Sequence, residues 1–125
     1  MRRFFTLVAL LIASTAILSA QQFDENFSDS TLRLDYTFLG NASEQHVALR
    51  DISETDGWWG RRTNLDSVPL KGNGDLTIYD QQSGKVIYKT SFSSLFQEWI
   101  TTPEAATVTR SFEFTILVPK PLREA

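Results

Sequence analysis

The sequence contains no cysteine and only one histidine, His46. Zinc sites are built mostly from Cys and His side chains, so the usual ligand sets cannot be assembled here. His46 lies in a segment that we expect to be a strand, and there we expect a surface residue and not a general base. The motifs H-E-x-x-H and G-x-S-x-G and the Walker phosphate loop are also missing from the sequence. We therefore expect no catalytic residue, no metal ligand, no cofactor and no enzymatic activity in this chain.

Carboxylates are the one remaining source of metal ligands. Asp51, Glu54 and Asp56 lie close together in the sequence. Calcium prefers such oxygen ligands, but this spacing lacks the further ligands of a calcium loop. We therefore expect a solvated loop at these residues and no calcium site.

Positive charge is also in short supply. The chain has 12 basic and 15 acidic residues, and two of the basic ones, Arg2 and Arg3, lie in the first twenty residues. Without these two, the net charge is about −5. Nucleic acids and anionic membranes bind to clustered positive charge, so this composition argues against both partners.

Long apolar runs are absent except for Phe4 to Ile12, which follows a basic start and precedes small residues up to Ala20. This order is typical of a secretory signal peptide. The alternative is a membrane anchor, but the run is shorter than the roughly 20 apolar residues that span a bilayer. We expect residues 1–20 to be a signal peptide, cut after Ala20 or, as the alternative, after Ala16. The protein would then be exported to the periplasm, the cell surface or the medium.

The remaining residues, 21–125, have the length of one small domain. Without cysteine, this domain has no disulfide bonds and must be stabilised by packing. Apolar and polar residues alternate in four segments, which predicts strands at Thr31–Leu39, about His46–Ile52, the hairpin Leu76–Phe92, and Val108–Val118. We expect an all-β fold, an antiparallel β-sandwich of about six to eight strands.

Turn chemistry supports the hairpin. Residues 80–84 would form its turn, with Gly84 in a positive-φ conformation. Before the first strand, Gln21 to Asp29 is polar, and we expect an extended lead-in there.

One segment departs from the alternation and predicts a short helical insert near residues 93–107. Ser94 and Gln97 have the spacing of a capping box, and Pro103 is suited to the start of a second turn. Three apolar residues share one helical face, Leu95, Phe96 and Trp99. Because aromatic helix faces usually pack, we expect these three residues to have a structural role at one end of the sandwich. We also expect this insert to hold the only helical turns of the domain.

The stretch "DGWWGRRTN" is the strongest candidate for binding. Trp58 and Trp59 lie between two glycines, and Arg61 and Arg62 follow. Exposed tryptophans stack on sugar rings, and arginines pair with carboxylates, so these four residues are candidate binding residues. In the alternative interpretation, one tryptophan fills the core and the arginines hold neighbouring acidic residues.

Four stretches together resemble the N-terminal domain of the immunoglobulin A peptidase family, which comprises secreted bacterial metallopeptidases, the sixty-fourth metallopeptidase family. They are "FDENFSDSTLRLDYTFLGN" (Phe23 to Asn41), "WGRR" (Trp59 to Arg62), "PLKGNGDLTIYDQQSGKVIYKTSFSSLFQEW" (Pro69 to Trp99) and "TVTRSFEFTILVPKPL" (Thr107 to Leu122). The resemblance implies a β-sandwich that precedes a separate zinc peptidase domain carrying H-E-x-x-H. The sequence stops at Ala125, just after the point where that domain would begin. The zinc and the peptidase activity therefore cannot be carried over to any residue here.

Three functional hypotheses remain, and the resemblance favours the first. The chain is a non-catalytic accessory or pro-region-like domain of such a peptidase, as a fragment or a truncated product, and its partner is the catalytic domain in cis or in trans. Alternatively, it is a free-standing secreted binding module for a glycan or a glycoprotein. The third hypothesis is a purely structural domain of the cell envelope.

Overall fold

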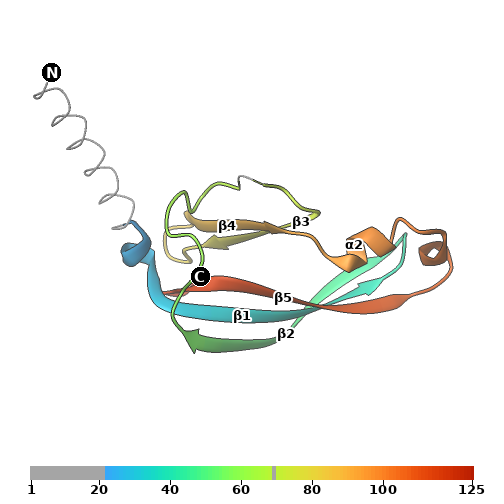
Figure 1. Ribbon diagram of the computed structural model, residues 1–125, viewed down its shortest axis with the longest axis horizontal. Helices are drawn as coiled ribbons and strands as arrows, with labels where there is room; N and C mark the ends of the chain where they lie inside the picture. The colour runs from blue at the N-terminus through green and yellow to red at the C-terminus, as the bar shows by residue number, and fades with distance from the viewer. Residues whose placement is uncertain (1–21, 69) are drawn as a thin grey trace, which may run out of the picture.

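The computed structural model describes residues 22–68 and 70–125, so the expected signal peptide lies outside the described residues. Within them, five strands form two antiparallel sheets: β1 (Phe27–Gly40), β2 (Gln45–Asp56), β3 (Gly74–Tyr79), β4 (Val86–Phe92) and β5 (Arg110–Pro121). The long sheet has the order β2-β1-β5, and β3 and β4 form a hairpin that lies over part of one face of it (Figure 1). The predicted all-β sandwich is confirmed, but its described strands are five and not six to eight.

β1 is the central strand of the long sheet. Its residue Leu34 pairs with Ile52 of β2 on one side and with Ile116 of β5 on the other. The predicted alternation is confirmed, because Leu32, Leu34 and Tyr36 pack against the buried core. One face of this sheet therefore turns towards the hairpin, and the other carries polar side chains.

β2 continues past its predicted end and includes the three carboxylates that were expected in a loop. Its last residues, 53–56, have low strand propensity, but Ser53 pairs with Arg33 and Asp56 with Ser30 of β1. Pairing with a long neighbouring strand outweighs local propensity here. Glu54 is held by Lys120 at 2.7 Å, so this carboxylate already has a partner within the protein.

The hairpin has the predicted turn. Gly84 has a φ of 68°, a conformation that side chains with a Cβ rarely adopt. The Asp80 carboxylate accepts hydrogen bonds from the backbone N–H of Ser83 at 2.8 Å and from its hydroxyl at 2.6 Å. These bonds add to the backbone bonds of the turn, in which the N–H of Gly84 donates to the carbonyl of Asp80 at 2.8 Å.

The core between the sheets is largely aromatic. At one end, the rings of Phe27 and Tyr88 meet edge to face, with centroids 6.1 Å apart. Further along, Phe92 of β4 packs on Phe114 of β5 at 5.1 Å. The buried cluster comprises Phe23, Phe27, Trp58, Leu65, Tyr88, Ile116 and Val118. The cluster combines residues of β1, β4 and β5 with residues of the first helical turn and of the loop after β2.

Residues 22–26 form a helical turn and not the expected extended lead-in. The reason lies in Phe23 and Phe27, which are four residues apart and therefore on the same side of a helical turn. Both are almost completely buried, and their ring centroids are 5.4 Å apart. The prediction that helical turns occur only in the later insert is therefore wrong.

The helical insert itself is confirmed, as α2 (Leu95–Trp99) and a 3-10 turn at Pro103–Ala106. Only half of the capping box forms, because the Ser94 hydroxyl accepts from the N–H of Gln97 but the Gln97 side chain bonds to Gln45. The Ser94 N–H donates instead to the side chain of Asn73 at 2.9 Å.

The expected packing of this insert is correct for Phe96 and wrong for Leu95. Phe96 is 1% exposed, Trp99 is half-buried, and Leu95 is 70% exposed. Trp99 packs on Phe112 with a centroid distance of 5.5 Å, and its Nε1 donates to Glu104. A helix of five residues presents only one narrow face to the sheet, and Phe96 and Trp99 occupy it.

The neighbouring residues Phe96 and Leu95 provide a matched test of this packing. We expect Phe96→Ala to lower the free energy of unfolding by about 3–5 kcal/mol, because it leaves a cavity under α2. We expect Leu95→Ala to change it by less than about 0.5 kcal/mol, since exposed side chains contribute little. Urea unfolding of both variants measures the difference, and equal losses would contradict this description of α2.

Candidate functional site

The loop after β2 carries the four candidate binding residues, and it buries the first of them. Gly57 turns the chain out of β2 with a φ of 84°. Trp58 is 7% exposed and meets the ring of Tyr88 edge to face at 6.2 Å. Its indole Nε1 donates to the carbonyl of Arg61 at 3.0 Å. Trp58 therefore fills the core and has no face free for a ligand.

Trp59 points the opposite way and is 91% exposed. Its ring lies beside Gly57, where an added Cβ would stand 3.2 Å from the indole nitrogen. Of the two tryptophans, only Trp59 has the exposure that stacking on a sugar requires.

The guanidinium of Arg61 is used within the protein. It donates to the backbone carbonyls of Asn64, Ser67 and Lys89. It also lies over the ring of Tyr88, 5.1 Å from its centroid. Arg61 therefore fastens the loop to β4 and has little capacity left for an external carboxylate.

Arg62 holds the start of β1. It forms an ion pair with Asp29 and lies 4.6 Å from the ring centroid of Phe23. The backbone N–H of Trp58 donates to the same carboxylate at 2.9 Å. This N–H and the Arg62 guanidinium hold the pKa of Asp29 below its ordinary value of 3.8. The structure thus places one tryptophan in the core and Arg62 on an acidic residue, whereas Arg61 binds backbone carbonyls and not the acidic residue that the structural interpretation expected.

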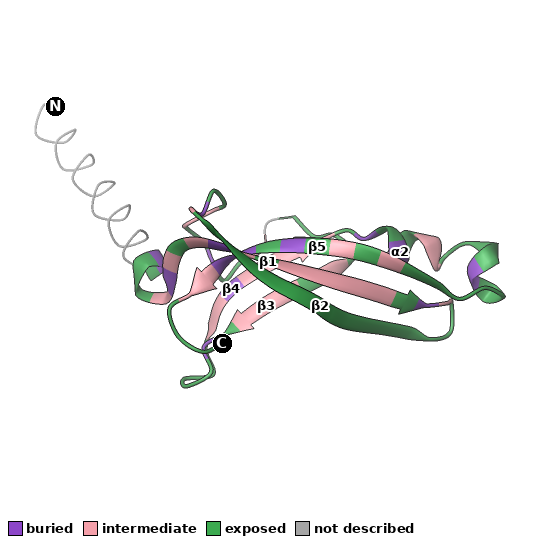
Figure 2. Ribbon diagram, turned by 90° about the horizontal axis from the view of Figure 1, so that it is seen from below, coloured by how far each residue is buried: buried purple, intermediate pink, exposed green. Residues whose placement is uncertain are grey.

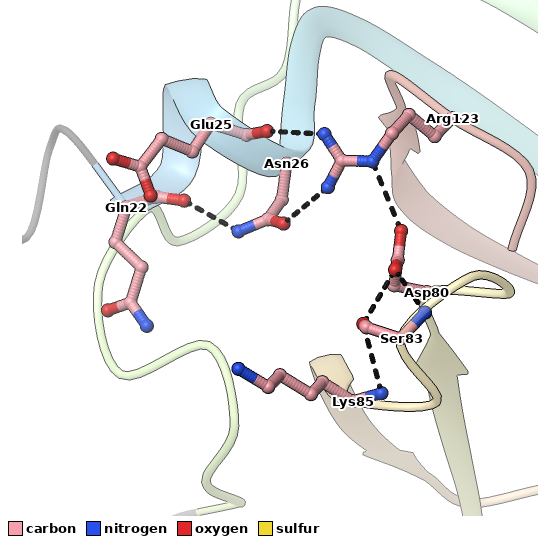
Figure 3. Close-up of polar contacts among 7 residues, drawn as sticks. All are labelled: Gln22, Glu25, Asn26, Asp80, Ser83, Lys85 and Arg123. Carbon is pink, nitrogen blue, oxygen red and sulfur yellow. Dashed lines mark hydrogen bonds and ion pairs between the residues drawn. The ribbon is translucent and has the colours of Figure 1, made fainter.

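A second polar cluster joins the two ends of the domain to the hairpin turn, and we call it the Arg123 clamp (Figure 3). Arg123 donates to the Asp80 carboxylate at 3.1 Å, to the carbonyl of Glu25 at 3.2 Å and to the side chain of Asn26 at 3.3 Å. The Ser83 hydroxyl and N–H, followed by Arg123, lower the pKa of Asp80. Arg123 thus joins the buried Asp80 carboxylate of the hairpin turn to Glu25 and Asn26 at the start of the domain.

Only the turn residues of this clamp can be recognised from the sequence. An aspartate at the start of a turn with a serine three residues later, as in Asp80 and Ser83, is a common turn signature. Arg123 gave no local signal, because its partners lie 43 to 98 residues away.

The residues that the structure describes contain no candidate metal site. No group of three or more His, Cys, Asp or Glu side chains among them is placed to hold a metal ion. His46 is exposed, and its ring nitrogen Nε2 lies 2.7 Å from the carboxylate of Glu44. In the same part of the chain, no helix is long and apolar enough to cross a membrane.

The two adjacent tryptophans should differ sharply in their contribution to stability. We expect Trp58→Ala to cost about 3–5 kcal/mol, because a large buried ring is lost from the core. We expect Trp59→Ala to cost less than about 1 kcal/mol, since its ring is exposed. Thermal melts of the two variants measure this, and a larger loss for Trp59→Ala would refute the assignment.

Acid should weaken the domain through carboxylates that are stabilised in their charged form. The pKa is lowered for Asp29, Asp35, Glu54 and Asp80. A pKa lower in the folded than in the unfolded state means that stability is present above the unfolded value and is lost as the pH falls through the folded one. We expect the melting temperature to drop between about pH 5 and about pH 2.

The matched variants for this prediction are Asp80→Asn and Asp24→Asn. Asp80 lies in the Arg123 clamp, whereas Asp24 is an exposed carboxylate outside the ion pairs of the described residues. We expect Asp80→Asn to flatten the pH dependence of the melting temperature and Asp24→Asn to leave it unchanged. Identical profiles for both variants would contradict the assignment of part of the acid sensitivity to Asp80 in the clamp.

Comparison with known proteins assigns the domain to a family. No curated protein matches this sequence. A family model described as the Peptidase M64 N-terminus matches residues 22–125, which is nearly all of the chain and includes every described strand. The match concerns the N-terminal region of these peptidases and includes no catalytic domain. The chain therefore belongs to the Peptidase M64 N-terminus family.

Proposed function

We propose that this chain is a non-catalytic accessory domain of a secreted zinc metallopeptidase, and that it binds the peptidase region in cis or in trans. The observation that carries the proposal is the family match over residues 22–125. The sequence supports the non-catalytic role, because H-E-x-x-H requires two histidines and this chain has one. The zinc ion and the general base would belong to the peptidase region.

The Arg123 clamp supports a role in positioning that region. Besides the side-chain bonds, the N–H of Leu122 donates to the carbonyl of Asn26 at 2.9 Å, and the N–H of Gln81 donates to that of Glu124 at 3.0 Å. The last residues of the domain are therefore fixed against both the hairpin turn and the first helical turn. A peptidase region that follows residue 125 would start from a rigid point, which limits its orientation relative to the sandwich.

The sequence pattern at the start of the chain supports the same proposal. The basic start and the apolar run before Ala20 are those of a secretory signal peptide. A domain without cysteine that relies on packing and ion pairs would fold equally well in an oxidising or a reducing compartment.

Trp59 supports a second candidate function, the binding of a glycan or a glycoprotein. A tryptophan that is 91% exposed on a loop whose other end is fixed by Arg61 is suited to stacking on a sugar ring. Because Trp58, Arg61 and Arg62 are engaged within the protein, this function would depend on Trp59 alone.

The test joins residues 1–125, which include the expected signal peptide, to the peptidase region of a member of the same family, and compares this protein with residues 1–21 joined directly to the same region. We expect the protein with the domain to be secreted and to cleave casein, and the protein without it to be secreted poorly or to cleave slowly. Arg123→Ala should expose the junction and raise its cleavage by a second protease about tenfold, because an opened segment is cleaved in proportion to its population. The matched control is Arg110→Ala, which removes an ion pair with Glu104 far from the clamp.

A peptidase region that is secreted and active to the same extent without this domain would contradict the proposal. The glycan function is decided separately, by a binding screen of residues 22–125 and of Trp59→Ala. Binding that is lost in Trp59→Ala would support the second candidate.

A further inference from the structure

The sandwich is less protected along one side than along the other. On the better protected side, β5 ends with Pro119 and Pro121, which lack the N–H that a further strand would need. The edge of β4 is covered by the preceding loop, since the N–H of Lys89 donates to the carbonyl of Leu65 at 2.7 Å. On the other side, β2 and β3 are the outer strands of their sheets, and no other described segment pairs with the backbone of β2.

The open side is also apolar. Three residues of β2 pair with inward-facing residues of β1 and so share the inner face of the sheet, yet they are exposed by 60%, 48% and 52%: Val47, Leu49 and Ile52. Figure 2 shows β2 exposed along its whole length beside the better-covered β1. Between Val47 and the free strand β3 lies a groove of about 340 Å³, lined further by Tyr36, Phe38, Leu76 and Phe92. Long exposed edges of this kind attract other strands.

An irregularity in β2 limits which strand fits. Opposite β1, Asp51 pairs with Asp35 and Leu49 pairs with Tyr36, so Arg50 is an extra residue that forms a bulge. Arg50 reaches Glu113 on the polar face, and Asp51 lies on that same face beside Asp35. A regular partner strand alternates its side chains strictly, so beyond this bulge its apolar residues would lie on the polar face of β2. A partner strand with the same bulge keeps its apolar residues on the apolar face on both sides of the bulge.

We propose that β2 pairs antiparallel with β2 of a second copy of this chain, about a twofold axis that passes between Arg50 and Asp51. In this register Leu49 lies opposite the partner's Ile52, and both belong to the apolar face. Arg50 lies opposite the partner's Asp51 on the polar face. The two bulges face each other, so each strand contributes the same number of residues.

The charges favour this register over its neighbours. A shift by one residue in either direction brings Arg50 opposite the partner's Arg50 or Asp51 opposite the partner's Asp51, and like charges directly opposite destabilise a strand pair. Asp51 also lies opposite Asp35 within its own sheet. Among the ion pairs of the described residues, none includes Asp51, whereas Asp35 is held by Arg33. The partner's Arg50 would supply the missing positive charge.

The interface is small, so we expect a reversible dimer. Stable complexes use about 20–30 residues on each side, and one strand offers far fewer. The dimer should therefore form as the concentration rises, and sedimentation-equilibrium experiments on residues 22–125 measure it. A chain that stays monomeric up to millimolar concentration would overturn the proposal and leave the open side to another partner, such as the peptidase region.

Charge reversal tests the register directly. Arg50→Asp places two aspartates opposite two aspartates, and Asp51→Arg places two arginines opposite two arginines, so each variant should raise the dissociation constant at least tenfold. The double variant restores opposite charges at both positions and should restore the dimer. A mixture of the two single variants should form a heterodimer, since each charge then meets its opposite.

Two further variants distinguish a specific loss of dimerisation from a general loss of folding. Leu49→Lys should abolish the dimer, whereas Leu117→Lys, at a similarly exposed leucine on the far face of the sheet, should leave it intact. Each variant is compared with the original chain by circular dichroism and thermal melting. If Arg50→Asp unfolds because it faces Glu113, then Asp51→Arg and Leu49→Lys decide the question. A dimer that tolerates both of these would refute the proposed axis.

Discussion

The long sheet is larger than the hairpin that covers it, and much of the structure follows from this mismatch. β1, β2 and β5 contain 14, 12 and 12 residues, whereas β3 and β4 contain only 6 and 7. Two strands of this length cannot bury one whole face of the sheet. The apolar surface that remains must be covered by other segments or stay exposed.

Aromatic residues outside the strands cover most of the remainder. At one end, Phe96 of α2 stacks on Phe38 with a centroid distance of 5.9 Å. At the other end, Phe23 of the first helical turn and Trp58 of the loop after β2 complete the core. Each of these segments is short and makes few backbone bonds of its own. Their conformations therefore depend on the ring that each one inserts, since large apolar area is the main favourable term available to them.

The sequence predicted the parts of this fold that depend on periodicity. β1 and the β3–β4 hairpin were recognisable because strict alternation over several residues matches a half-buried strand and does not match a helix. The helical turn at 22–26 was missed, because its cause is the burial of Phe23 against Phe27 and not the propensity of the polar residues between them. The exposure of Leu95 was missed because a single helical turn does not fix which of two adjacent apolar residues faces the sheet.

The candidate site shows a different limit of sequence reasoning. The stretch from Trp58 to Arg62 has a composition typical of a binding loop, and the same composition is suited to a structural plug. The two interpretations differ only in where each side chain points, which depends on distant partners such as Tyr88 and Asp29. The Arg123 clamp was hidden for the same reason, because contacts over such distances leave no mark in local sequence.

The two surfaces that we propose as functional lie on different parts of the domain. The clamp gathers the hairpin turn, the first helical turn and the last residues around Asp80. The twofold axis instead passes through the bulge at Arg50, in the middle of an edge strand. Pairing through β2 therefore leaves the clamp free, and a peptidase region held there would not displace the second copy. The open edge would then set how many copies assemble, and the clamp would set how each peptidase region is oriented within the assembly.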